Sequence, residues 1–370
     1  MAAIDGVRRF GTLIARLLGL AGGLAAVGSA KAVDLPENRA DLMFHGYDGG
    51  GVRATGPALL VRKSMLDRVS LSASYYADMV SNASIDVVTQ ASPYKETRNE
   101  YAVGADYAVR DALISLSAST SREPDYQADA VNLDVSQETF GGMTTVALGF
   151  TRARDKVGRK DIGFFDRASH WRYRVGVTQI LTPRWLASIN AEAVSDDGFL
   201  GSPYRAARVF GALVPERNPR TRSGRAVKLR TIGEIADRQS VRAEYRYYWD
   251  TWDIRSHTAE AGYARHFGEQ WLADAYLRYY SQRRALFYSD NATAETLYVS
   301  RNRQLGTFSS VGLGAKLAYT WKRVPGQYEV RLQGALERSR FDFTDFTDIR
   351  TGSPYAYDAN VVQVFVSATF

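Results

Sequence analysis

The chain contains no cysteine, so it can form neither a disulfide bond nor a cysteine-ligated metal site. Its four histidines, at positions 45, 170, 257 and 266, lack the close pairing that holds zinc, and no phosphate-binding loop or dinucleotide fingerprint occurs. Ser256 and His257 give the one hint of a hydrolase, but adjacent residues of a strand point to opposite faces. The sequence therefore predicts no enzymatic activity, no metal and no other cofactor.

After residue 32 the sequence also lacks an apolar run long enough for a membrane-spanning helix, which needs about 18 residues or more. Lysine is scarce relative to arginine, and the net charge is a modest +7. Arginine suits paired or networked charges better than lysine does. No basic cluster is interleaved with aromatic residues, so we expect no nucleic-acid partner.

The N-terminal segment has the order of a secretory signal. A basic region precedes an apolar run rich in leucine, alanine and glycine, and the tripeptide Ala-Lys-Ala at 30–32 fits a cleavage site. We therefore expect a signal peptide over residues 1–32 and one exported domain over residues 33–370. An N-terminal helix of the folded domain is the alternative.

The end of the chain alternates strictly between two faces. Val362, Val364, Val366 and Ala368 form an apolar face, and the sequence stops at Phe370. A period of two is that of a β-strand whose sides meet different surroundings. The closing strand of a Gram-negative outer-membrane barrel usually has this form, and the barrel assembly machinery recognises its terminal aromatic residue. An edge strand of a soluble sandwich is the alternative.

Similar segments recur along the chain, separated by tight turns and longer connections that alternate, with no helical period between them. Short turns at one end and long loops at the other are typical of outer-membrane barrels. The sequence predicts an all-β, antiparallel transmembrane β-barrel of about sixteen strands, or fourteen if the first hairpin lies outside the wall. The predicted strands are 39–47, 52–63, 69–79, 98–109, 113–121, 126–136, 143–152, 170–180, 185–194, 224–235, 241–250, 254–266, 271–282, 306–321, 328–343 and 357–370.

The two faces of these strands differ as a membrane barrel requires. One face is aliphatic and aromatic, with rings near the strand ends as in interfacial girdles. The other carries both signs of charge, and a lipid-facing charge near the midplane costs about 2–4 kcal/mol. We therefore predict that the charged face is luminal, although a solvated face of a soluble sheet would alternate in the same way. The predicted pore-lining residues are Arg172, Arg174, Glu192, Arg242, Glu244, Arg246, Asp274, Arg278, Lys316, Glu329 and Arg331.

Several short stretches are together similar to an uncharacterised family of Gram-negative outer-membrane β-barrel proteins, a domain of unknown function. These stretches are 56–63, 83–89, 202–205, 219–222, 245–248, 250–252 and 287–290. They are spread over most of the chain that follows the signal. The resemblance implies a barrel in the cell outer membrane, and it implies no activity.

Three connecting segments have compositions that bear on function. Residues 80–97 are apolar enough that we expect them to fold into the mouth as a constriction or plug. Residues 205–225 are rich in arginine, which suits lipopolysaccharide phosphates or an anionic solute, or else ion pairs within the loop. Asp342, Asp345 and Asp348 offer oxygen ligands to a hard cation, with a solvated loop as the plainer interpretation.

Two functions fit such a barrel. The first is a porin-like or specialised conduit for small polar solutes, because sixteen strands can enclose a water channel. The alternative is a non-conducting scaffold that anchors a periplasmic or surface partner in a redox or export assembly. In both cases the expected surroundings are outer-membrane lipid and lipopolysaccharide.

Deleting Phe370 tests the predicted assembly signal. The deletion should lower the amount of barrel in the outer membrane, because the assembly machinery would lose the aromatic residue that it recognises. Phe370→Tyr keeps an aromatic ring and is the matched control. Folded barrel is measured from the mobility difference between unheated and boiled membrane samples on SDS gels, and unchanged amounts of the deletion variant would contradict the prediction.

Overall fold

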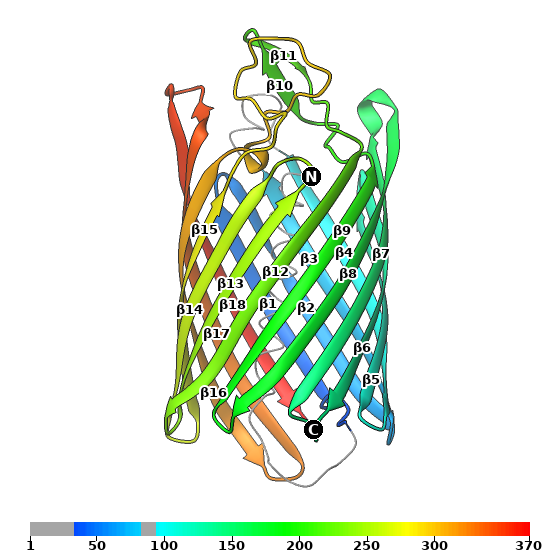
Figure 1. Cartoon of the computed structure of the whole chain (residues 1–370), viewed down its shortest axis with the longest axis vertical. Helices are drawn as coiled ribbons and strands as arrows, with labels where there is room; N and C mark the ends of the chain where they lie inside the picture. The colour runs from blue at the N-terminus through cyan, green and yellow to red at the C-terminus, as the bar shows by residue number, and fades with distance from the viewer. Residues whose placement is uncertain (1–32, 83–93) are drawn as a thin grey trace.

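The computed structural model describes residues 33–82 and 94–370, and in this part of the chain sixteen antiparallel strands close into one barrel (Figure 1). The predicted signal peptide at 1–32 lies outside the described residues. Within the described ranges the helical elements are two single turns, η1 (Lys160–Ile162) and η2 (Arg303–Leu305). No helix there is both long and apolar enough to cross a membrane.

Consecutive strands of the wall pair with one another in chain order. β10 (Ala206–Val209) and β11 (Ala212–Pro215) are the exception, because they form a separate two-stranded sheet and leave β9 to pair directly with β12. The wall consists of β1 (Arg39–Gly49), β2 (Val52–Leu66), β3 (Val69–Asn82), β4 (Tyr94–Val109), β5 (Ala112–Glu123), β6 (Tyr126–Thr139), β7 (Thr144–Arg159), β8 (Phe164–Thr182), β9 (Trp185–Gly198), β12 (Thr221–Ala236), β13 (Gln239–Asp250), β14 (Arg255–Phe267), β15 (Trp271–Gln282), β16 (Phe308–Val324), β17 (Tyr328–Asp348) and β18 (Ser353–Thr369).

The barrel closes where the last strand meets the first. β18 pairs with β1 over the whole length of β1, and the Phe370 N–H donates a hydrogen bond of 3.0 Å to the Asn38 carbonyl. This pairing satisfies the backbone of both strands and leaves no open edge. The predicted closing strand and the count of sixteen are confirmed. The fourteen-strand alternative is wrong, because β1 and β2 belong to the wall.

Several strands extend beyond their predicted bounds. β7 continues to Arg159 and β8 begins at Phe164, so most of the segment between the predicted strands 143–152 and 170–180 is itself strand. β3 and β4 likewise reach into the predicted loop at 80–97, of which residues 83–93 lie outside the described part of the chain. The extensions are rich in polar residues. The sequence predicts strands only where apolar residues alternate, whereas backbone pairing continues beyond these residues.

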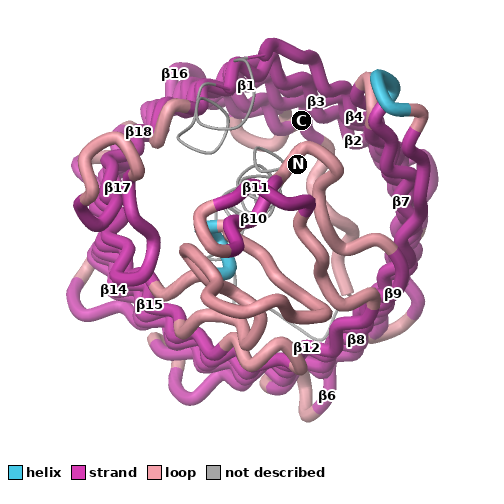
Figure 2. Tube along the Cα trace, turned by 90° about the horizontal axis from the view of Figure 1, so that it is seen from above, coloured by secondary structure: helices cyan, strands magenta, loops and turns pink. Residues whose placement is uncertain are grey.

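The two ends of the barrel differ. Tight turns, including those between β4 and β5 and between β8 and β9, lie at the lower end in Figure 1, and the connections from β9 to β12 and from β15 to β16 lie at the upper end. Seen from above, these two long connections fold inward across the mouth (Figure 2). The first contains the β10–β11 hairpin, where the sequence predicts only a loop.

β2 and β3 approach each other closely at Gly56. Residues 56 and 57 form no backbone pairs with β3, although the register is unchanged from Thr55↔Met79 to Ala58↔Tyr76. A Cβ on Gly56 would lie 1.8 Å from the Ala77 carbonyl oxygen. The approach therefore requires glycine at this position.

Replacing Gly56 tests this approach. Gly56→Ala should destabilise the folded barrel by about 1–3 kcal/mol, because the added methyl group must displace backbone. Gly46→Ala is the matched control, since a Cβ there meets Thr55 Cγ2 at an ordinary 3.7 Å. The urea midpoints of the two variants in phospholipid vesicles provide the measurement. Equal midpoints would show that the close approach does not contribute to stability.

Candidate functional site

Ion pairs between strands that are not neighbours identify the inner face of the wall. The Arg174 guanidinium on β8 donates a hydrogen bond of 2.8 Å to the Asp134 carboxylate on β6, across β7. Side chains on the concave side of a closed wall converge, whereas those on the convex side splay apart. The charged face is therefore the inner one. Exposed apolar residues such as Leu148 and Val175 belong to the outer one.

A glycine at the crossing point allows this reach. Gly149 of β7 lies in register between Asp134 and Arg174. A Cβ there would lie 2.4 Å from Asp134 Oδ1 and 2.6 Å from Arg174 Nε. The two side chains therefore meet over the bare backbone of the intervening strand.

A second network joins β13, β14 and β15. Arg242 donates a hydrogen bond of 2.9 Å to Asp274 and lies 3.6 Å from Glu260. Its guanidinium lies over Gly262, where a Cβ would come within 2.4 Å of Cζ. Arg278 donates to the same Glu260 at 2.7 Å. Cationic and anionic side chains thus offset one another within this network.

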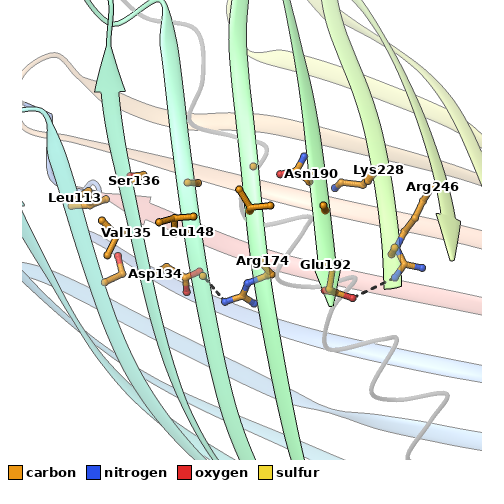
Figure 3. Close-up of a pocket in the computed structure, with 17 residues that line it drawn as sticks. Leu113, Asp134, Val135, Ser136, Leu148, Arg174, Asn190, Glu192, Lys228 and Arg246 are labelled. Carbon is orange, nitrogen blue, oxygen red and sulfur yellow. Dashed lines mark hydrogen bonds and ion pairs between the residues drawn. The ribbon is translucent and has the colours of Figure 1, made fainter. Parts of the chain in front are cut away.

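Glu192 on β9 forms ion pairs with two further arginines. Its carboxylate lies 3.6 Å from Arg172 on β8 and 3.5 Å from Arg246 on β13. Figure 3 shows Glu192 directed toward Arg246, and Arg174 directed the other way, toward Asp134. The charges consequently form a lateral band of alternating sign across neighbouring strands.

Two other predicted residues have different surroundings. Glu244 lies 3.5 Å from Lys228 on the neighbouring strand β12. Lys316 has its Nζ 5.2 Å from the centroid of the Phe365 ring, which faces it from β18. One predicted residue therefore extends the band of ion pairs, and the other makes a cation–π contact.

A separate group of charges lies at the short-turn end. Glu329 forms ion pairs with both Arg323 and Arg331. Arg323 and Glu329 pair directly beside the turn between β16 and β17. This group is therefore at the rim of the barrel, apart from the central networks that contain most of the predicted residues.

The sequence prediction omits four charged residues that complete the networks. These are Asp134, Lys228, Glu260 and Glu337, the last lying 4.0 Å from Arg278. Each has the alternation of the predicted face, so the period of two contains a signal for it. The partners are set by the register between distant strands, which no local pattern contains.

A recess of about 310 Å³ opens on the inner wall between β5 and β13. Gly149 and Gly176 belong to its lining, and Arg174, Glu192 and Arg246 border it (Figure 3). Polar groups that converge on a concavity are typical of sites that orient a small ligand. The recess is thus a place where a polar solute can contact both signs of charge.

Another sector of the inner wall carries hydroxyl groups. On β3 the inward positions include Ser72 and Ser74, and on β5 they include Ser115 and Ser117. Ser115 donates a hydrogen bond of 2.6 Å to Asp106, which belongs to the same face of β4. The inner wall is therefore asymmetric, with hydroxyl groups prominent on one side and dense ion pairs on the other.

Two histidines lie in polar clusters that the sequence analysis did not identify. His45 on β1 is fully buried and lies 2.6 Å from Asp78 on β3. His170 on β8 lies between Asp155 at 3.0 Å and Asp196 at 2.7 Å. Each histidine has the inward alternation, but its carboxylates come from other strands. Only the assembled register brings these groups together.

The two long connections form a packed cap over the mouth. Ala285, Tyr288 and Leu305 of the β15–β16 connection are buried together with Trp252 and Ile254 from the connection between β13 and β14. A bridge between residues 209 and 292 links β10 to the same β15–β16 connection. The cap therefore has its own apolar core.

Arg301 fastens this cap to the wall. Its side chain is 1% exposed and donates hydrogen bonds to Asp290 Oδ1 at 2.8 Å and to the Thr347 carbonyl at 2.7 Å. The guanidinium also lies 4.3 Å from the centroid of the Phe346 ring. One buried cation thus joins the β15–β16 connection to the upper end of β17.

The arginine-rich residues at 205–225 are largely engaged in contacts within the protein. Arg220 pairs with Asp166 at 2.7 Å, and Arg222 pairs with Asp250 at 2.6 Å. These contacts agree with the interpretation of this segment as a set of internal ion pairs. They leave fewer guanidinium groups available for phosphate.

The three aspartates at 342–348 do not converge on one point. Asp345 accepts a hydrogen bond of 2.8 Å from the Thr307 N–H. Asp348, at the upper end of β17, accepts hydrogen bonds from Arg350 that hold the pKa of its carboxyl below the usual value. Within the described ranges no group of three or more histidine, cysteine, aspartate or glutamate side chains could hold a metal ion.

Residues 75–161 and 158–333 match a family described as "Protein of unknown function (DUF3570)". The chain belongs to this family. The predicted resemblance to an uncharacterised family of outer-membrane barrels is therefore confirmed. No curated protein shows significant sequence similarity to the chain.

Solved structures share the fold. A structure described as "Bacterial polysaccharide outer membrane secretin" is similar with a TM-score of 0.53 and 9% identity, over 90% of this chain and 99% of that one. OmpTdeltaL8, an outer membrane protein of Vibrio cholerae, is similar with a TM-score of 0.47 and 8% identity, over 90% of this chain and 98% of that one. The CymD monoaromatic hydrocarbon channel is similar with a TM-score of 0.44 and 11% identity, over 91% of this chain and 89% of that one. The first of these likenesses establishes an outer-membrane type of β-barrel and no more than the fold.

Replacing Arg301 tests how the cap is held. Arg301→Gln should release the β15–β16 connection, because breaking a buried ion pair costs about 3–5 kcal/mol. Arg283→Gln is the control, since Arg283 is 61% exposed and pairs with Asp253 at the surface at 3.3 Å. In intact proteoliposomes, proteolysis of this connection should be faster than in the wild type for Arg301→Gln and unchanged for Arg283→Gln. Equal rates in the two variants would contradict a fastening role.

Proposed function

We propose that this protein is a porin-like or specialised conduit for small polar solutes across the Gram-negative outer membrane. The observation that carries the proposal is the polar inner wall, with its bands of ion pairs and its hydroxyl sector, inside a closed sixteen-stranded barrel. Barrels of this size can enclose an aqueous channel. The inner residues predicted from the sequence would then line the pore.

The charge arrangement bears on which solutes pass. Arg174 and Arg242 have carboxylate partners, so the inner wall attracts both ends of a dipolar or hydrogen-bonding solute. We expect only a weak preference for anions, because paired charges leave a small excess of positive potential. Salt should diminish this preference by screening.

Charge reversal on the inner wall tests the conduit. The double variant Arg174→Glu and Arg246→Glu should shift the reversal potential in a planar bilayer toward cation selectivity, because it replaces two cations beside Asp134 and Glu192 with anions. Arg53→Glu is the control, since Arg53 lies at the upper rim with its side chain 75% exposed. A wild-type barrel that passes no ions, or equal shifts in both variants, would contradict the proposal.

A non-conducting scaffold is the second candidate, and the packed cap favours it. A mouth covered by folded connections suits a barrel that presents a surface to a periplasmic or surface partner. Shortening the β15–β16 connection distinguishes the two functions. Conductance that rises in the shortened variant supports a capped conduit, whereas a barrel that stays closed to ions supports the scaffold.

A further inference from the structure

The outer wall contains a hollow in its apolar surface. It has a volume of about 550 Å³ and extends across β14 to β18, close to the short-turn end. Small residues create it, because Ala273, Ala275, Ala315 and Gly334 occupy adjacent outward rows of the register. A Cβ on Gly334 would meet nothing within 4 Å. The hollow is therefore open on the side that faces lipid.

Large apolar side chains surround this floor. Tyr263, Phe267, Leu336 and Val364 line the hollow and are themselves exposed on the outer surface. In a bilayer such a space holds hydrocarbon, because water is excluded there and an unfilled gap loses dispersion contacts. The surface thus has the chemistry of a groove for an acyl chain.

One cation stands at the edge of the hollow. Arg265 is exposed, and its guanidinium lies 5.1 Å from the centroid of the Phe267 ring. Its neighbour in the row on β13 is Gln239, and the one carboxylate among the lining residues, Asp274, faces the interior. A guanidinium binds phosphate strongly, and the lipid headgroup is the anion available at this surface.

We propose that the hollow binds one phospholipid, with an acyl chain on the Ala273–Gly334 floor and the phosphate on Arg265. A second copy of the chain fits less well. A two-fold interface would set Arg265 against the same apolar and cationic surface, with no outward carboxylate in the lining to pair with it. Charge complementarity therefore favours the lipid.

Lipid retention tests the proposal. The barrel is reconstituted in mixed phosphatidylcholine and phosphatidylglycerol vesicles, extracted into detergent and examined by native mass spectrometry. The wild type should keep one phospholipid under detergent conditions that remove the bulk lipid. Gly334→Leu should lose it, because the leucine side chain fills the hollow. Arg265→Gln should reduce retention several-fold, because the contact with the phosphate is lost.

Ala118→Leu is the matched control. Ala118 faces outward and is exposed on β5, away from the hollow, so this variant should retain the lipid as the wild type does. All variants are first checked for the gel mobility shift of a folded barrel. The proposal would be overturned if Gly334→Leu and Ala118→Leu retained equal amounts of phospholipid. It would also be overturned if the wild type carried only detergent and no phospholipid. A wild-type dimer that becomes a monomer in Gly334→Leu would also overturn the proposal, because a second copy of the chain would then occupy the hollow.

Discussion

Pairing of every backbone hydrogen-bonding group is the constraint on which this structure depends. In hydrocarbon an unpaired N–H or C=O costs several kcal/mol, so a wall of strands must close on itself. The β1–β18 pairing meets this requirement, and the N–H of Phe370 is used as well. Closure also fixes an inside and an outside. The alternation along each strand then sorts charges to one side and apolar residues to the other.

The closed wall also brings side chains together across strands that are not neighbours. Asp134 and Arg174 meet because Gly149 leaves the surface between them bare. On the outer side the same absence of a side chain, at Gly334, leaves a hollow toward lipid. Glycine thus has opposite uses on the two faces. Inside it lets long charged residues reach each other, and outside it leaves open space on the apolar surface.

The cap adds a second level of organisation. Its buried core and the ionic contacts of Arg301 hold two long connections over the mouth. These connections therefore make the opening at the mouth narrower than the barrel itself. For the proposed conduit, this cap is the folded structure that a solute would pass before it meets the inner wall, and for the proposed scaffold it is the surface offered to a partner.

The sequence alone determined the closing strand and the face on which Arg174, Glu192, Arg242 and Arg246 lie, because a period of two is a local property of the chain. It limited the strand count to sixteen or fourteen, and the structure decided for sixteen because β1 and β2 belong to the wall. It did not determine the partners Asp134, Glu260 and Glu337, the clusters around His45 and His170, the β10–β11 hairpin or the outer hollow. These features depend on which strands become neighbours, at what register, and on how long connections pack. Contacts between residues far apart in the chain decide them, and those contacts exist only in the closed barrel.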